Sequence, residues 1–124
     1  MSEWLIPWLS AFAVTQAVEM PIYVRALREG EPTIDRLPVA IAIAFGASAL
    51  THPIVWFVMP RLITGDWLTM VLVAELFAIV AEAAWLWAFG LRAFGLKRAL
   101  AWAAFANAAS VLVGLISRQL FGWP

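Results

Sequence analysis

The chain has 124 residues, of which 65% are hydrophobic and 13% charged, against ~25% charged residues in typical soluble domains. Basic and acidic residues balance to a formal net charge of zero, so the charge gives no reason to expect binding to nucleic acid. Cysteine is absent, which excludes disulfides, thiolate metal sites and thiol catalysis. The composition is typical of a protein that lies in a lipid bilayer.

Four apolar runs are each long enough to cross a membrane, which takes ~20 residues. In chain order we place them at residues 4–23, 38–59, 67–89 and 99–121. No basic segment precedes the first run, so we interpret that run as a retained helix and not as a signal peptide. The sequence predicts an all-α integral membrane protein, with residues 1–124 forming a single transmembrane domain, a compact bundle of four helices.

Turn and cap residues separate the runs. Residues 28–33 read as a charged turn, and Pro38 stands where a second helix would begin. Pro60 is expected to close that helix. Asp66 immediately precedes the third run and is expected to act as its N-cap.

Basic residues predict the orientation. Six of the eight lie in or beside the first and third connections: Arg25, Arg28, Arg36, Arg92, Lys97 and Arg98. The other side of the membrane receives only Arg61 and Arg118. Because basic loops stay on the cytoplasmic side, we expect both termini to face outward. We expect the bacterial inner membrane as the location.

Polar residues inside the runs are the candidate functional residues, because ionisable groups are costly in a bilayer, with estimates starting near ~2.5 kcal/mol. Three of them are glutamates: Glu19, Glu75 and Glu82. The others that matter most are Gln16, His52, Asn107 and Ser110, and His52 is the only histidine of the chain.

The rise of 1.5 Å per helical residue places these side chains at two depths. Glu19, Glu82 and Asn107, with Gln16, fall roughly 6–12 Å from the cytoplasmic ends of their spans. His52 and Glu75 fall about 21 Å from those ends, and hydroxyl side chains, including Ser110, lie between the two layers.

Helical phase predicts that the polar faces meet inside the bundle. Glu75 and Glu82 are seven residues apart and therefore project from nearly the same face of the third helix. On the fourth helix, one arc of roughly 80° holds four small or polar residues: Asn107, Ser110, Gly114 and Ser117. Polar faces turn away from lipid, so a common interior site is expected.

Each of these features also has a purely structural interpretation. Asn107 and Ser110 resemble the residues that hold membrane helices together. His52 could form a structural hydrogen bond with Glu75. The glutamates could be protonated or paired without any functional role. Pro21 and Pro53 each follow an ionisable residue closely and remove a backbone hydrogen bond beside it, which predicts kinks near the polar groups.

The sequence therefore favours a small membrane transporter or channel whose buried acidic and histidine groups handle protons, a cation or a cationic substrate. The predicted ion-binding residues are Glu19, His52, Glu75, Glu82, Asn107 and Ser110. The alternative is an accessory subunit of a larger membrane complex. We expect the lipid bilayer and a homo-oligomer or partner membrane subunits as partners. No cofactor is expected, the metal signature is weak, and catalysis is the least supported class because no catalytic motif is present.

Overall fold

Four long helices make up the protein. The computed structural model describes residues 2–30 and 36–122. Helix α1 spans Ser2–Gly30 and helix α2 spans Leu37–Pro53; α2 continues through a π-helical turn, Ile54–Val58, into the short α3, Met59–Leu62. Helix α4 spans Trp67–Phe89, and α5 spans Leu96–Phe121 after a 3₁₀ turn at Arg92–Phe94. The predicted all-helical bundle is confirmed.

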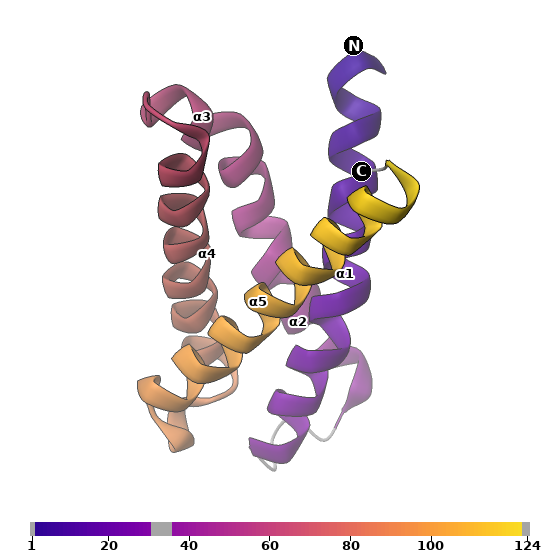
Figure 1. Cartoon of the computed structure of the whole chain (residues 1–124). Coiled ribbons are helices and arrows are strands. Elements are labelled where there is room, and N and C mark those ends of the chain that lie inside the picture. The colour runs from indigo at the N-terminus through magenta and orange to yellow at the C-terminus, as the bar shows by residue number, and fades with distance from the viewer. Residues whose placement is uncertain (1, 31–35, 123–124) are drawn as a thin grey trace.

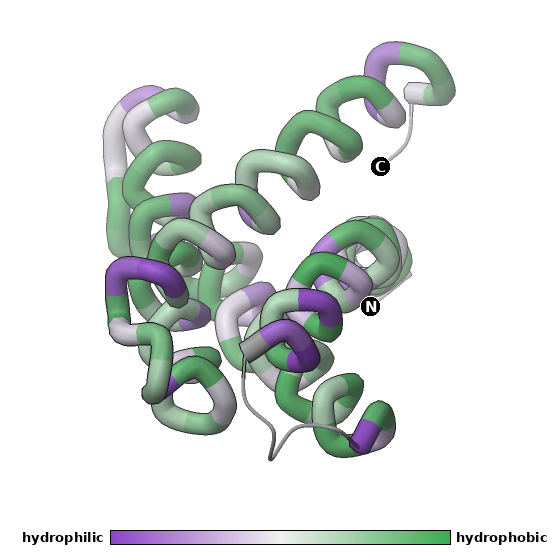
Figure 2. The backbone as a smooth tube through the Cα atoms, turned by 90° about the horizontal axis from the view of Figure 1, so that it is seen from below, coloured by the Kyte–Doolittle hydropathy of each residue, from purple (hydrophilic) through white to green (hydrophobic). Residues whose placement is uncertain are grey.

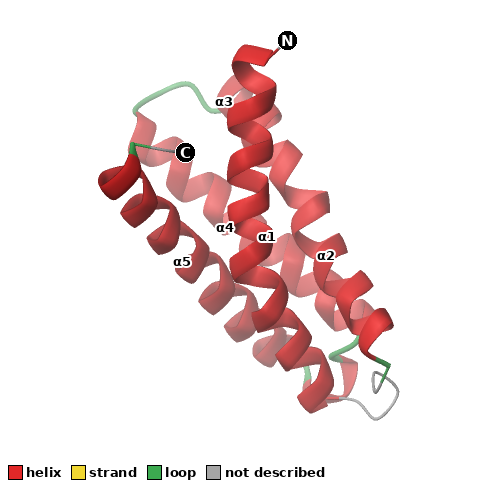
Figure 3. Ribbon diagram, turned by 90° about the vertical axis from the view of Figure 1, so that its right-hand side faces the viewer, coloured by secondary structure: helices red, strands yellow, loops and turns green. Residues whose placement is uncertain are grey.

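The four helices form a ring in which each packs against two neighbours. Helix α1 contacts α2 and α5, and α4 contacts the same two helices from the opposite side. Figures 1 and 3 show the bundle from two directions, with α5 running obliquely across the others. The start of α1 lies at the same end of the bundle as α3, which we call the α3 end (Figure 1). Side chains that point inward from all four helices therefore meet at the centre of the ring.

The outer surface of the bundle is apolar. All four long helical segments are long and hydrophobic enough to span a membrane: Glu3–Glu29, Leu37–Leu62, Trp67–Phe89 and Leu96–Phe121. Large apolar side chains such as Leu72, Leu76 and Leu112 are exposed. Figure 2 shows hydrophobic colouring along most of each helix, with hydrophilic residues confined to short segments. Such a surface is suited to lipid, and the protein is a four-span membrane bundle.

Alanine lines the interior of the bundle. Ala40, Ala44 and Ala47 form a fully buried face of α2, and α4 and α5 also carry buried alanines. Apolar burial gives little driving force between helices in lipid, so association depends on close backbone approach and van der Waals contact. Small side chains permit that approach. The same packing brings the few inward polar side chains within bonding distance.

Helix α1 is longer than its apolar run predicts. The predicted span ended at Tyr23, whereas the helix continues to Gly30. Arg25 and Glu29 lie one turn apart and form an ion pair, with 3.0 Å between Arg25 Nε and Glu29 Oε1, which supports the added turns. The predicted charged turn at residues 28–33 is therefore partly helix, and its remainder lies outside the described residues.

The second span also departs from its prediction. Pro38 begins the helix as expected. Pro60 does not end it, because Pro60 stands at the first turn of α3, where the missing N–H costs little. Pro53 does disturb the helix, since the π-helical turn follows it directly. Pro21, by contrast, lies inside a helix that continues past it.

Asp66 caps α4 as predicted. Its Oδ1 accepts a hydrogen bond of 2.7 Å from the Thr69 backbone N–H, and its Oδ2 accepts one of 2.9 Å from the Thr69 hydroxyl. The backbone hydrogen bond from Thr69 lowers the pKa of Asp66, because it favours the charged form. The third span begins at the predicted residue, Trp67, for this reason.

Helix α2 approaches α4 closely at Gly46. A Cβ atom added at Gly46 would lie 2.6 Å from Cζ2 of Trp85. The indole Nε1 of Trp85 donates a hydrogen bond of 2.9 Å to the Ile43 carbonyl, which fixes the ring against α2. Gly114 in α5 is different, because a Cβ atom there would meet no heavy atom within 4 Å.

We predict that Gly46→Ala destabilises the bundle by about 1–3 kcal/mol, because the added methyl group displaces the Trp85 ring. Gly114→Ala is the matched control and should leave stability within about 1 kcal/mol of wild type. Unfolding in detergent measures both variants. Equal effects of the two substitutions would contradict the proposed close contact.

Candidate functional site

Polar side chains from all four long helices meet at the centre of the ring. We call this group the acidic cluster; its members are Glu19 and Tyr23 of α1, Ser48 and Thr51 of α2, Glu82 of α4, and Asn107 and Ser110 of α5. The two glutamates are each 1% exposed. They approach from α1 and α4, which lie on opposite sides of the ring.

Glu19 accepts two hydrogen bonds from hydroxyl groups on different helices. The Ser48 hydroxyl of α2 donates to Oε2, and the Ser110 hydroxyl of α5 donates to Oε1 over 2.7 Å. Both carboxyl oxygens are therefore engaged. Through this single side chain, α1 is bonded to both of its neighbours.

Glu82 is held in the same way from the other side. The Tyr23 hydroxyl donates to its Oε1 over 2.9 Å, and the Thr51 hydroxyl donates to its Oε2 over 3.1 Å. The Asn107 amide donates to the Tyr23 oxygen over 3.3 Å and to the Ala103 carbonyl over 2.9 Å. Tyr23 thus links α1 to both α4 and α5.

The electrostatics of this cluster are unbalanced. The carboxyl groups of Glu19 and Glu82 are close enough to repel each other when both are charged. The hydroxyl groups that donate to them are neutral, and the one ion pair found among the described residues, Arg25–Glu29, is exposed at the helix end. Two buried negative charges without a cation are strongly unfavourable.

Two of the hydroxyl donors have a second acceptor within reach. The Ser110 oxygen lies 3.0 Å from the Asn107 carbonyl oxygen as well as near Glu19. The Thr51 oxygen lies 3.3 Å from the Ala47 carbonyl oxygen as well as near Glu82. Each hydroxyl can turn its proton to the backbone when the carboxyl group itself carries a proton. The network therefore fits both protonation states of either glutamate.

The structure brings together four of the six predicted site residues: Glu19, Glu82, Asn107 and Ser110. It does not join the other two, because His52 and Glu75 form no hydrogen bond with each other in the described parts of the chain. His52 instead lies among aromatic rings, with its ring centroid 5.3 Å from Phe12, 6.1 Å from Trp56 and 6.3 Å from Trp8. The predicted outer layer of His52 and Glu75 is therefore not a bonded pair.

Glu75 lies at the edge of the cluster. It is partly buried on the face of α4 that carries Glu82, and it is close enough to Glu19 for an electrostatic interaction. Gly114, which was expected on the polar face of α5, lies beyond the cluster beside open space. The shared face of Glu75 and Glu82 is thus present, and on α5 Asn107 and Ser110 reach the cluster.

Sequence reasoning missed Tyr23 and underrated Ser48 and Thr51. Tyr23 was taken as the end of a helix, yet it is fully buried. Its signal was the spacing of four residues from Glu19, which places both side chains on one face of a continued helix. Ser48 and Thr51 continue the buried alanine face of α2 at helical spacing, which could have placed them against Glu19 and Glu82.

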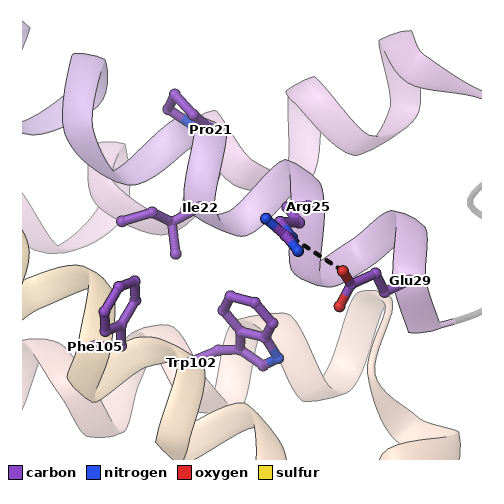
Figure 4. Close-up of a pocket in the computed structure, with 6 residues that line it drawn as sticks. All are labelled: Pro21, Ile22, Arg25, Glu29, Trp102 and Phe105. Carbon is purple, nitrogen blue, oxygen red and sulfur yellow. Dashed lines mark hydrogen bonds and ion pairs between the residues drawn. The ribbon is translucent and has the colours of Figure 1, made fainter.

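Two surface grooves lie near the bundle's helix contacts, and neither has Glu19 or Glu82 in its wall. One, of about 450 Å³, lies between α1 and α5. Figure 4 shows its lining, with the Arg25–Glu29 ion pair at one end and Pro21, Ile22, Trp102 and Phe105 forming its apolar part. The other, of about 620 Å³, lies beside Gln16 and is lined mainly by apolar side chains. Glu19 and Glu82 are each 1% exposed, so the acidic cluster is closed in this conformation.

Within residues 2–30 and 36–122, no group of three or more His, Cys, Asp or Glu side chains is arranged to hold a metal ion. No protein-family model, no curated protein and no solved structure matches this chain. The arguments for function therefore rest on the geometry of the acidic cluster.

We predict that Tyr23→Phe destabilises the protein by about 1–3 kcal/mol, because Glu82 loses a donor and Asn107 loses an acceptor in a dry interior. Unfolding in detergent measures the effect. Ser10→Ala, which removes a hydroxyl group elsewhere on α1, is the control and should change stability by no more than about 0.5 kcal/mol. A Tyr23→Phe protein as stable as this control would show that the hydrogen bonds of the Tyr23 hydroxyl do not stabilise the fold.

Proposed function

We propose that this chain is a small membrane carrier or channel in which the Glu19–Glu82 pair handles protons, a cation or a cationic substrate. Protons are the occupant that the hydrogen bonds of the cluster support best. The observation that carries the proposal is the burial of two neighbouring carboxyl groups whose donors are all neutral.

The charge balance supports a positively charged occupant. A buried pair of carboxyl groups is stable when it shares a proton or holds a cation, and it is costly when both groups are charged and unpaired. The cluster contains no basic side chain that would fill this role permanently. The pair is therefore better suited to a positive charge that can be exchanged, such as a proton or a cation, than to the permanent charge of a basic side chain.

The hydroxyl groups support the choice of a proton. Ser110 and Thr51 each have a backbone carbonyl as second acceptor, so neither is stranded when a glutamate gains a proton. Loading and release then require rotation of hydroxyl groups and no movement of a helix. Such rotation is a low-cost way to pass a proton between bonded partners.

Transport through this fold favours an assembly of several copies of the chain. Four helices enclose little volume, and the acidic cluster is closed within one copy of the chain. We propose a parallel homo-oligomer, in which contacts between copies provide or gate the way to Glu19 and Glu82. The apolar outer faces of the helices offer the surface for such contacts.

The decisive variant is Glu82→Gln. Glutamine keeps the shape and one acceptor oxygen but cannot release a proton, so we expect loss of pH-dependent proton flux while the fold and melting temperature stay close to wild type. Flux is measured in liposomes that contain purified protein and a pH-sensitive dye. Glu82→Leu should fold less well, because Tyr23 and Thr51 lose their shared partner.

The matched control is Glu29→Gln, the same chemical change at the exposed end of α1. Its flux should equal that of wild type. Glu82→Gln protein with wild-type flux at every pH would defeat the carrier proposal and favour the accessory role described below.

The orientation with both termini outside is part of the proposal, and the distribution of basic residues supports it. In the bacterial inner membrane, which we propose as the location, a tag at either terminus should be accessible from the periplasm. A tag between Phe94 and Lys97 should be protected until the membrane is opened. Protected termini would reverse the orientation.

One observation favours the accessory alternative. The acidic cluster is closed and all four carboxyl oxygens already accept hydrogen bonds, as expected of polar groups that only hold helices together. The mass of the protein in detergent distinguishes the two roles. A stable homo-oligomer is expected of the carrier, whereas a monomer that loses its fold without other subunits is expected of an accessory subunit.

A further inference from the structure

Three buried polar atoms have no hydrogen-bond partner among the described residues, and all three belong to α1 or α2. They are Nε1 of Trp8, Oε1 of Gln16 and Nδ1 of His52. Gln16 and His52 are nine-tenths buried, with 7% and 9% of their surfaces exposed. A buried polar atom without a hydrogen-bond partner destabilises the folded protein. Three such atoms along one pair of packed helices call for a common physical cause.

The three side chains lie along the interface between α1 and α2. Trp8 and Gln16 are eight residues apart on α1, and Phe12 lies midway between them. Trp8, Phe12 and Gln16 therefore lie on one face of α1. The Trp8 and His52 ring centroids are 6.3 Å apart. The amide nitrogen of Gln16 donates to the Phe45 carbonyl over 3.1 Å, which fixes the remaining oxygen in place. Two polar positions result: Trp8 with His52, and Gln16.

The chemistry of the atoms identifies what fits between them. The indole N–H of Trp8 can only donate, and the amide oxygen of Gln16 can only accept. A cation would satisfy Gln16 but would be repelled by the Trp8 N–H, and an anion would fit Trp8 but not Gln16. Water donates and accepts, so it satisfies all three atoms. Buried waters typically bridge such otherwise unsatisfied groups.

Both positions lead toward the acidic cluster. His52 follows Thr51 directly and lies one turn from Ser48 on the buried face of α2, about 6 Å along the helix axis. Water molecules joined by bonds of about 2.8 Å cover this distance with one or two members. Gln16 lies one turn before Glu19 on α1. Such waters would connect the α3 end of the interface to the Ser48–Glu19 bond.

We infer that ordered water molecules bind between α1 and α2 at Trp8, His52 and Gln16 and form the route by which protons reach Glu19 from the α3 end. The inference that water binds at this interface rests on the unpaired atoms alone. The inference that these waters conduct protons to Glu19 rests on the proposed function. His52 and Gln16 are then positioning residues for water. The Phe12 ring lies beside the first of these positions, 5.3 Å from the His52 ring.

Solid-state nuclear magnetic resonance on the protein in bilayers tests the hydration. His52 is the only histidine, so ¹⁵N-labelled histidine reports on one site. Tryptophan labelled at the indole nitrogen adds Trp8 and an internal control, Trp85, whose N–H donates to the Ile43 carbonyl. The Trp8→Phe and Trp85→Phe proteins assign the two signals. Lipids with deuterated chains remove transfer from the bilayer.

We expect magnetisation to pass from water to Trp8 and to the His52 ring markedly faster than to Trp85. Gln16→Leu should preserve the fold and the transfer to Trp8, since it removes only the second position. Transfer to Trp8 and His52 no faster than to Trp85 would overturn the inferred waters.

Proton flux tests the route separately. Trp8→Phe and Gln16→Leu should each slow the flux that depends on Glu82, without altering the buried carboxyl pair. If the resonance experiment detects the waters but the Trp8→Phe and Gln16→Leu proteins both keep wild-type flux, the proposed proton route is wrong. If Glu82→Gln keeps wild-type flux, the proposed function and the route fall together, while the resonance measurement still decides whether the interface holds water.

Discussion

The burial of Glu19 and Glu82 without a basic partner is the constraint on which the rest of the structure depends. Each carboxyl group is 1% exposed and must be bonded from several helices, because unpaired polar atoms in a membrane interior are costly. The donors come from α1, α2 and α5, so the two glutamates connect all four long helices. The bundle therefore buries these polar groups, and their hydrogen bonds in turn hold its four long helices together.

Alanine packing makes this network possible. The fully buried alanines of α2 and α5 let the backbones approach closely enough for short side chains such as Ser48 and Ser110 to reach Glu19. Larger residues at those positions would separate the helices and leave the carboxyl groups unbonded. The small residues and the polar residues therefore act as one unit, and neither set explains the bundle alone. The same closeness excludes bulky occupants from the cluster in this conformation.

The candidate site was predictable where helix periodicity alone decides position. Glu75 and Glu82 share a face because they are seven residues apart, and Asn107 with Ser110 follows the same rule. Tyr23 was not predicted, because the apolar run ends there while the helix continues through Arg25 and Glu29. His52 was matched to Glu75 by depth, yet depth carries no information on rotation about the helix axis. In the structure, aromatic rings surround His52.

The sequence by itself determined the membrane location of this protein, its four helices, the cap at Asp66 and the membership of Glu19 and Glu82 in a buried polar layer. These follow from local rules, since hydrophobic length, capping chemistry and helical period each depend on residues near in the chain. Only the tertiary structure decided that Tyr23 and Thr51 hold Glu82 while Ser48 and Ser110 hold Glu19. Those pairings depend on the order of helices around the ring and on their rotation, which side chains distant in sequence fix together.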